Sequence, residues 1–103
     1  MGTVVRRFII QNQIGLHARP AARFVQLASS FTLNSIWIQN LTRQSNRVRA
    51  TSLIMVLSIS ALQNDEVEVT VEGEQAEITM QAFVDFFDGH LVDATELPTG
   101  DPE

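Results

Sequence analysis

The 103-residue chain contains no cysteine and no lysine. Without cysteine there are no disulfides and no thiolate metal sites, which fits a reducing compartment. No apolar run approaches the roughly 20 residues of a membrane-spanning helix, and the N-terminus lacks the long apolar segment of a secretory signal. We therefore expect a cytoplasmic, monomeric single domain with no metal, no cofactor and no direct membrane insertion.

The charged residues are divided between the two halves of the chain. All seven basic residues are arginines that precede residue 50, and all twelve acidic residues follow residue 64. Such asymmetry can mark a surface for nucleic acid or for an acidic partner. The alternative is that elements from both halves interleave in space, so that the charges mix. We favour mixing for the whole molecule, with a local positive patch around Arg19 and Arg23.

The hydrophobic pattern predicts the element order β-α-β-β-α-β-α. Alternation and β-branched residues indicate strands over residues 4–10, 35–40, 47–50 and 66–72. Apolar residues at helical spacing indicate helices over residues 18–30, 52–59 and 75–88, with Gly89 as the final stop. Short connections imply a mostly antiparallel sheet covered on one face by the helices, an α+β two-layer domain. Residues 1–90 would form this domain, and residues 91–103 a partly disordered acidic tail.

One segment combines the groups that phosphoryl transfer needs. In residues 15–22, GLHARPAA, His17 lies directly before a predicted helix and Arg19 follows two residues later. A helix N-terminus offers unpaired N–H groups that attract phosphate, a guanidinium matches phosphate oxygens, and an imidazole can act as a nucleophile. On the residues alone, a solvated or helix-capping histidine remains the alternative for His17. We interpret His90, just after the predicted helix end, as a surface residue.

The string GLHARPAARFV resembles the active-site signature of the HPr phosphocarriers of the phosphoenolpyruvate–sugar phosphotransferase system. The similarity covers roughly residues 4–88, including the EVEVTVEGE strand and the amphipathic last helix. It implies an open-faced sandwich with a four-stranded antiparallel sheet and three helices. It also implies a carrier, not an enzyme, that accepts a phosphoryl group on His17 from phospho-enzyme I and passes it to IIA-type proteins. Arg19 would steady the phosphate, and the backbone N–H groups of Ala18 and Arg19 would form the anion site.

The resemblance also implies a partner surface on the outer face of the first two helices. Its positions are Ala22, Arg23, Gln26, Leu53, Ile54, Met55 and Leu57. The helix over residues 52–59 is too apolar all round for an exposed helix, which fits a docking patch, whereas we expect Val56 in the core. Ser52 stands where a serine kinase/phosphorylase modifies some family members. A simple N-cap serine is the alternative there.

Some positions depart from the family pattern and leave the choice of partner open. The hairpin over residues 40–47 is longer than usual, Thr51 replaces a lysine before Ser52, and Ser60 and Asn64 replace small or glycine residues. The alternative function is a regulatory phosphotransfer or binding module, nitrogen-type or serine-phosphorylated, that is not dedicated to sugar uptake. We do not expect a nucleic-acid partner, because there is neither a GXXG clamp nor an array of strand aromatics for base stacking.

Overall fold

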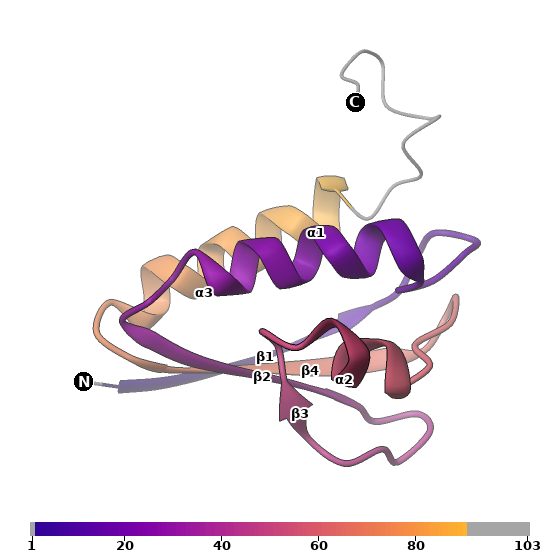
Figure 1. Ribbon diagram of the computed structural model, residues 1–103, viewed down its shortest axis with the longest axis horizontal. Coiled ribbons are helices and arrows are strands. Elements are labelled where there is room, and N and C mark those ends of the chain that lie inside the picture. Colours follow the sequence, from indigo (N-terminus) through magenta and orange to yellow (C-terminus); the bar gives the residue numbers. More distant parts are fainter. Residues whose placement is uncertain (1, 91–103) are drawn as a thin grey trace.

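The computed structural model describes residues 2–90, with side chains through residue 88, as a sheet layer and a helix layer (Figure 1). The elements are β1 (Gly2–Ile9), α1 (Ala18–Ser29), β2 (Asn34–Asn40), β3 (Val48–Arg49), α2 (Leu53–Ser58), β4 (Glu66–Gly73), α3 (Ala76–Asp85) and the π-helical turn η1 (Phe86–His90). The predicted order and the α+β open-faced sandwich are confirmed. The predicted tail, residues 91–103, lies outside the described residues.

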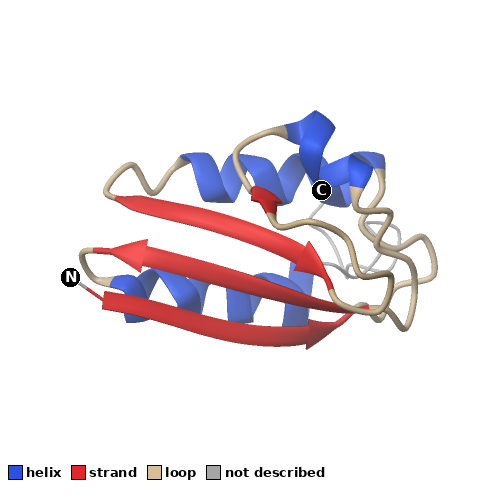
Figure 2. Ribbon diagram, turned by 90° about the horizontal axis from the view of Figure 1, so that it is seen from below, coloured by secondary structure: helices blue, strands red, loops and turns tan. Residues whose placement is uncertain are grey.

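The four strands form one antiparallel sheet in the order β1-β4-β2-β3, whose uncovered face is turned to the viewer in Figure 2. β4 pairs with both long neighbours: Ile9 of β1 lies opposite Glu66, and Asn40 of β2 lies opposite Val67. The C-terminal ends of β1 and β2 therefore lie together, beside the start of β4. The loops that follow these two strands and the turn that precedes β4 meet at this end of the sheet.

Strand alternation divides the sheet residues between a buried and an uncovered face. Ile36, Ile38 and alternate valines of β4 are buried with Phe24 of α1 and Phe83 of α3, whose ring centroids are 5.3 Å apart. Trp37 faces the opposite way. The guanidinium carbons of Arg47 and Arg49 lie 4.4 and 5.3 Å from the centroid of its ring, within range of cation–π attraction.

The end of the last helix differs from the prediction. The pattern indicated one helix over residues 75–88 with Gly89 as its stop, but α3 ends at Asp85 and the backbone continues as η1 through His90. The wider π turn accompanies the burial of two consecutive aromatic rings. Phe86 and Phe87 both contact Phe24, and Phe87 also stacks on Phe8 with centroids 4.4 Å apart. Periodicity alone predicts a regular helix here.

Ion pairs join the two halves of the chain. Arg6 pairs with Glu77, Arg7 with Glu68 and Arg43 with Asp65, at N–O distances of 3.9, 3.1 and 2.7 Å. The prediction that the separated charge sets mix in space is confirmed for these pairs. Among residues 2–90, no helix is long and apolar enough to cross a membrane.

Candidate functional site: a histidine at the N-terminus of α1

A tight turn after β1 delivers His17 to the start of α1. The Gly15 N–H donates to the Asn12 carbonyl at 3.2 Å, and the Asn12 side-chain amide donates to the Gly15 carbonyl at 3.0 Å. The Leu16 N–H donates to the Ala61 carbonyl at 2.8 Å. Gly15 has φ +79°, and a Cβ at this position would lie 2.4 Å from the Ala61 carbonyl oxygen. Only glycine fits this turn, which fixes the position from which His17 projects.

His17 is the N-cap residue of α1, with an extended backbone (φ −104°, ψ −162°). Its carbonyl accepts the first helical hydrogen bond, from the Ala21 N–H at 2.7 Å. Its imidazole makes no capping hydrogen bond, and the residue is exposed. The interpretation of His17 as a capping side chain is therefore wrong, and solvent or a partner can reach the ring. The side chain of His90 lies outside the described residues.

The first turn of α1 has the features of an anion site. The N–H groups of Ala18 and Arg19 have no hydrogen-bond partner within residues 2–90, and Pro20 has no N–H to offer. No acidic residue occupies this turn, so nothing there offsets the positive end of the helix dipole. Arg19 is exposed and forms no ion pair with another described residue. Arg23, one turn further along the same side of α1, is half-buried.

The predicted partner surface lies on α1 and α2, which contact each other. Gln26 is exposed, whereas Ala22 and Arg23 are half-buried. On α2 the exposed apolar residues are Leu53, Ile54, Met55 and Leu57, of which Ile54 is the most open at 79%. Val56 is fully buried, so its prediction as a core residue is confirmed. The apolar side chains of α2 that the sequence assigned to a partner are accessible.

Ser52 is the N-cap of α2. Its Oγ accepts a hydrogen bond from the Met55 N–H at 3.3 Å, and the residue is half-buried. The N-cap interpretation of Ser52 is confirmed. The cap matters because α2 has only six residues and little internal hydrogen bonding of its own.

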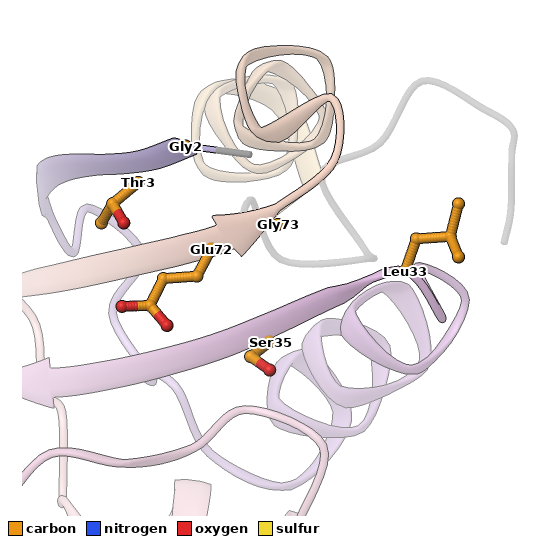
Figure 3. A pocket seen from close by; sticks show the side chains of 6 residues that line it. All are labelled: Gly2, Thr3, Leu33, Ser35, Glu72 and Gly73. Atoms are coloured by element: carbon orange, nitrogen blue, oxygen red, sulfur yellow. The ribbon is translucent and has the colours of Figure 1, made fainter.

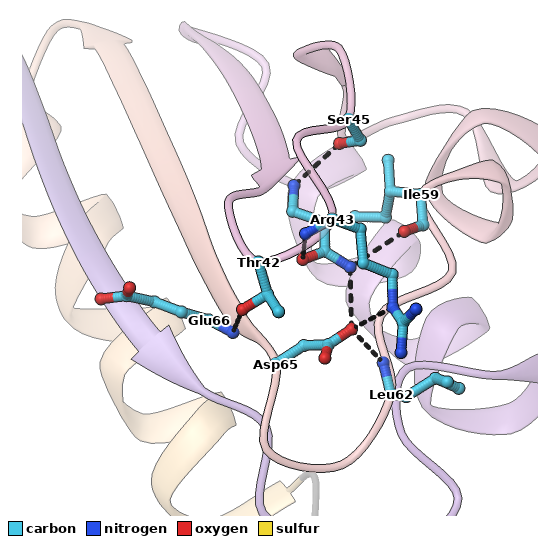
Figure 4. Close-up of polar contacts among 8 residues, drawn as sticks. Thr42, Arg43, Ser45, Ile59, Leu62, Asp65 and Glu66 are labelled. Atoms are coloured by element: carbon cyan, nitrogen blue, oxygen red, sulfur yellow. Dashed lines mark hydrogen bonds and ion pairs between the residues drawn. The ribbon is translucent and has the colours of Figure 1, made fainter.

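Sequence analysis missed Asp65, the one buried charged residue among those whose side chains are described. Its Oδ2 accepts hydrogen bonds from the Leu62 N–H, Asn40 Nδ2 and Arg43 Nε (Figure 4). Desolvation raises the pKa of Asp65, but these three hydrogen bonds and the charge of Arg43 outweigh it, so the pKa lies below its usual value. Two of the donors come from 22 and 25 residues away. In the sequence alone, Gln63-Asn64-Asp65 before a predicted strand is typical of a turn.

His17 and Arg19 are exposed at the N-terminal end of α1. A hollow of about 510 Å³ lies at the start of β1, lined by Gly2, Thr3, Leu33, Ser35, Glu72 and Gly73 (Figure 3). Because β1 runs from Gly2 toward the His17 loop, this hollow lies at the opposite end of the sheet. It contains none of the predicted site residues. No group of three or more His, Cys, Asp or Glu residues in the described part of the chain could hold a metal ion.

The structure is an open-faced sandwich that exposes a histidine at a helix N-terminus. Residues 4–88 match the family described as the PTS HPr component phosphorylation site. The chain belongs to the HPr family of phosphocarrier proteins.

Similar proteins include both free-standing carriers and larger proteins. The chain is 32% identical to the phosphocarrier protein HPr of Xylella fastidiosa over 87 residues, which cover 84% of this chain and 93% of that protein. It is 40% identical over 81 residues to the multiphosphoryl transfer protein of Haemophilus influenzae, but spans only 16% of its length. Among solved structures, HPr from Bacillus anthracis is similar, with a TM-score of 0.75, 30% identity, and coverage of 84% of this chain and 99% of that one.

Proposed function

We propose that the protein accepts a phosphoryl group on His17 from phospho-enzyme I and passes it to IIA-type acceptors. The observation that carries this proposal is that the imidazole of His17, an exposed residue, makes no capping hydrogen bond and lies beside the unpaired N–H groups of Ala18 and Arg19. Both partners must reach the same nitrogen in turn, which an exposed helix end allows and a closed cavity would hinder. The lack of cysteine fits the reducing cytoplasm in which we place this exchange.

The chemistry follows from the surroundings of the ring. A neutral imidazole nitrogen attacks the phosphorus atom of the phosphorylated donor, the new N–P bond forms, and the donor group leaves. Charge is spread over three phosphoryl oxygens during transfer, so fixed positive groups are the main catalytic requirement. The amides of Ala18 and Arg19 and the Arg19 guanidinium supply such groups. These groups make no hydrogen bond or ion pair with another residue within 2–90 that phosphate binding would have to break. Little reorganisation should therefore accompany phosphate binding.

The exposed side chains of α2 are proposed as the apolar centre of the docking surface. Leu53, Ile54, Met55 and Leu57 are the exposed apolar residues of this short helix, and Arg23 and Gln26 of the neighbouring α1 add a polar border. Apolar residues enclosed by a polar rim are typical of protein interfaces. Enzyme I and the acceptors would use this surface in turn, with the carrier acting as a monomer.

A second candidate function is regulation through Ser52, which we propose as a phosphorylation site for a serine kinase/phosphorylase. Ser52 directly precedes Leu53 of the docking surface and lies at the positive end of α2. A phosphate there would add a charge of about −1.5 to −2 that the helix end stabilises. The same charge would border the apolar surface and weaken docking. In this form the protein would serve as a regulatory module, not only as a carrier for sugar uptake.

Labelling with phosphoenolpyruvate and enzyme I tests the proposal. The wild-type protein should become an acid-labile, base-stable phosphoprotein, as expected for phosphohistidine. The chain has only two histidines, which provides a matched control: His17→Ala should abolish labelling and His90→Ala should retain it. An unlabelled wild-type protein, or label that persists in His17→Ala, would contradict the assignment.

A further inference from the structure

The loop that presents His17 rests on the turn between α2 and β4. The Leu16 N–H donates to the Ala61 carbonyl at 2.8 Å, and the backbone of Gly15 lies so close to Ala61 and Leu62 that no Cβ fits between them. This hydrogen bond is made by the residue directly before His17. The position of the imidazole therefore depends on where residues 61 and 62 lie.

The start of the same loop is tied to the same turn. The Ile10 N–H donates to the Asp65 carbonyl at 2.9 Å, and the Asn64 N–H donates to the Ile10 carbonyl at 2.7 Å. The Gln63 side-chain amide donates to the Gln11 carbonyl at 3.1 Å. The loop thus contacts the turn at both of its ends and does not stand free in solvent.

The carboxylate of Asp65 holds this turn. Its Oδ2 accepts the Leu62 N–H at 3.0 Å, which closes the turn from within. The same oxygen accepts Asn40 Nδ2 at 3.0 Å, from the end of β2, and Arg43 Nε at 2.7 Å, from the β2–β3 connection (Figure 4). Asp65 is 4% exposed and its bond to Asn40 is buried, whereas the bonds to Arg43 and Leu62 are part-buried. A hydrogen bond is electrostatically stronger in the protein interior than in water.

We propose that Asp65 is a positioning residue for His17, acting through the Leu62 amide and the Ala61 carbonyl. The inference rests on the proposed phosphoryl acceptance by His17. The geometry joins three segments at one end of the sheet. The end of β2 and the connection after it supply Asn40 and Arg43, the α2–β4 turn supplies Asp65, and this turn supports the His17 loop. Displacement of a reacting group by about 1 Å can slow a reaction by a factor of up to ~100. Disturbing Asp65 should therefore slow transfer at His17 without altering the docking surface.

The alternative is that Asp65 merely stabilises the fold. Both readings predict lower stability when the carboxylate is lost, so stability alone does not separate them. Only positioning predicts that the amide exchange and NMR shifts of Leu16 and His17 change in molecules that are still folded. Only positioning predicts a lower kcat at an unchanged KM of phospho-enzyme I for this carrier.

The experiment compares Asp65→Asn and Arg43→Gln with a control, Glu68→Gln. Asp65→Asn keeps the shape and an acceptor oxygen, and Arg43→Gln removes only the charged donor. Glu68→Gln removes the charge from the exposed Arg7–Glu68 pair, which is 3.1 Å long and shares no hydrogen bond with Asp65. Amide exchange and NMR shifts of Leu16 and His17 are measured under conditions where urea unfolding shows each variant to be folded. Initial rates of phosphoryl transfer from phospho-enzyme I are measured over a range of carrier concentrations.

For Asp65→Asn we expect Leu16 exchange to be faster and kcat lower, each on the order of tenfold, with KM within about twofold. Arg43→Gln should show the same changes to a smaller extent, and Glu68→Gln should match wild type. Unchanged Leu16 exchange in folded Asp65→Asn overturns the proposal, as does a lower kcat without any change at Leu16 and His17. If the wild-type protein takes no label, the proposed function fails, while the exchange measurement still decides the coupling between Asp65 and the loop.

Discussion

Replacement of Gly15 by alanine tests the backbone that presents His17. Gly15 combines a left-handed backbone with close contact to a neighbouring turn: at φ +79°, an added Cβ would lie 2.4 Å from the Ala61 carbonyl oxygen and 2.8 Å from the Leu62 Cα. Both obstructing atoms belong to the backbone, so no side chain can rotate away. The loop itself must move, and the 2.8 Å bond from the Leu16 N–H to Ala61 must lengthen or break.

The free-energy cost is the sum of opposing effects. A left-handed conformation costs an alanine about 1–2 kcal/mol, and forcing an extra methyl group into packed structure costs about 1–3 kcal/mol. Alanine also restricts the unfolded chain, which returns about 0.4–1 kcal/mol. We therefore expect Gly15→Ala to lower the free energy of unfolding by about 1–5 kcal/mol.

The assay is urea unfolding followed by the fluorescence of Trp37, the only tryptophan in the chain. Gly2→Ala is the matched control, because a Cβ at Gly2 meets nothing within 4 Å. That variant should unfold as wild type does. Phosphoryl labelling of Gly15→Ala should be slower in the fraction that remains folded. If Gly15→Ala had the same urea midpoint and labelling rate as Gly2→Ala, the turn would not be fixed by glycine and the reasoning would be refuted.

Three further predictions use the same unfolding measurement. The pKa of Asp65 is lower in the folded state, so its contribution to stability is full above its unfolded pKa of about 3.8 and is lost as pH falls through the folded value. The difference in unfolding free energy between wild type and Asp65→Asn should therefore shrink on acidification below about pH 4. Val56→Ala should lower the free energy of unfolding by about 2 kcal/mol, because Val56 is fully buried. Ile54→Ala should change this free energy by less than about 0.5 kcal/mol but raise the KM of phospho-enzyme I for the carrier. Ser52→Ala should cost about 1 kcal/mol through loss of the α2 cap, and a Ser52→Asp variant that retains an acceptor should recover most of it.

The features that sequence predicted are those encoded within a few residues. Alternating valines and acids over residues 66–72 define β4, because strand side chains alternate between faces. The histidine, arginine and proline at the start of α1 lie within four residues, so their shared location at a helix N-terminus follows from spacing alone. The cap on α2 is likewise a local bond, from the Met55 N–H to Ser52. Each of these features involves residues close together in the sequence, so each can be recognised without knowledge of the fold.

The features that sequence missed depend on strand pairing. Asn40 ends β2 and Asp65 directly precedes β4, and the two approach only because these strands pair antiparallel with Asn40 opposite Val67. On its own, a sequence of Gln-Asn-Asp before a strand is typical of a solvated turn. Burial of such an aspartate is unfavourable unless several donors surround it. Only the Leu62 N–H comes from its own turn, whereas Asn40 and Arg43 lie 25 and 22 residues away.

The central position of β4 therefore decides more about the site than any local motif does. Since β1 and β2 both run antiparallel to β4, their C-terminal ends meet at the start of β4, where the α2–β4 turn lies. The loop from β1 carries His17, and the loop from β2 carries Arg43. If β4 lay at an edge of the sheet, Asp65 could contact only one of these loops, because its carboxylate reaches Asn40 and Arg43 on the β2 side and its backbone carbonyl reaches Ile10 on the β1 side. The motif supplies the reactive group, and the strand order supplies the support that keeps this group in place.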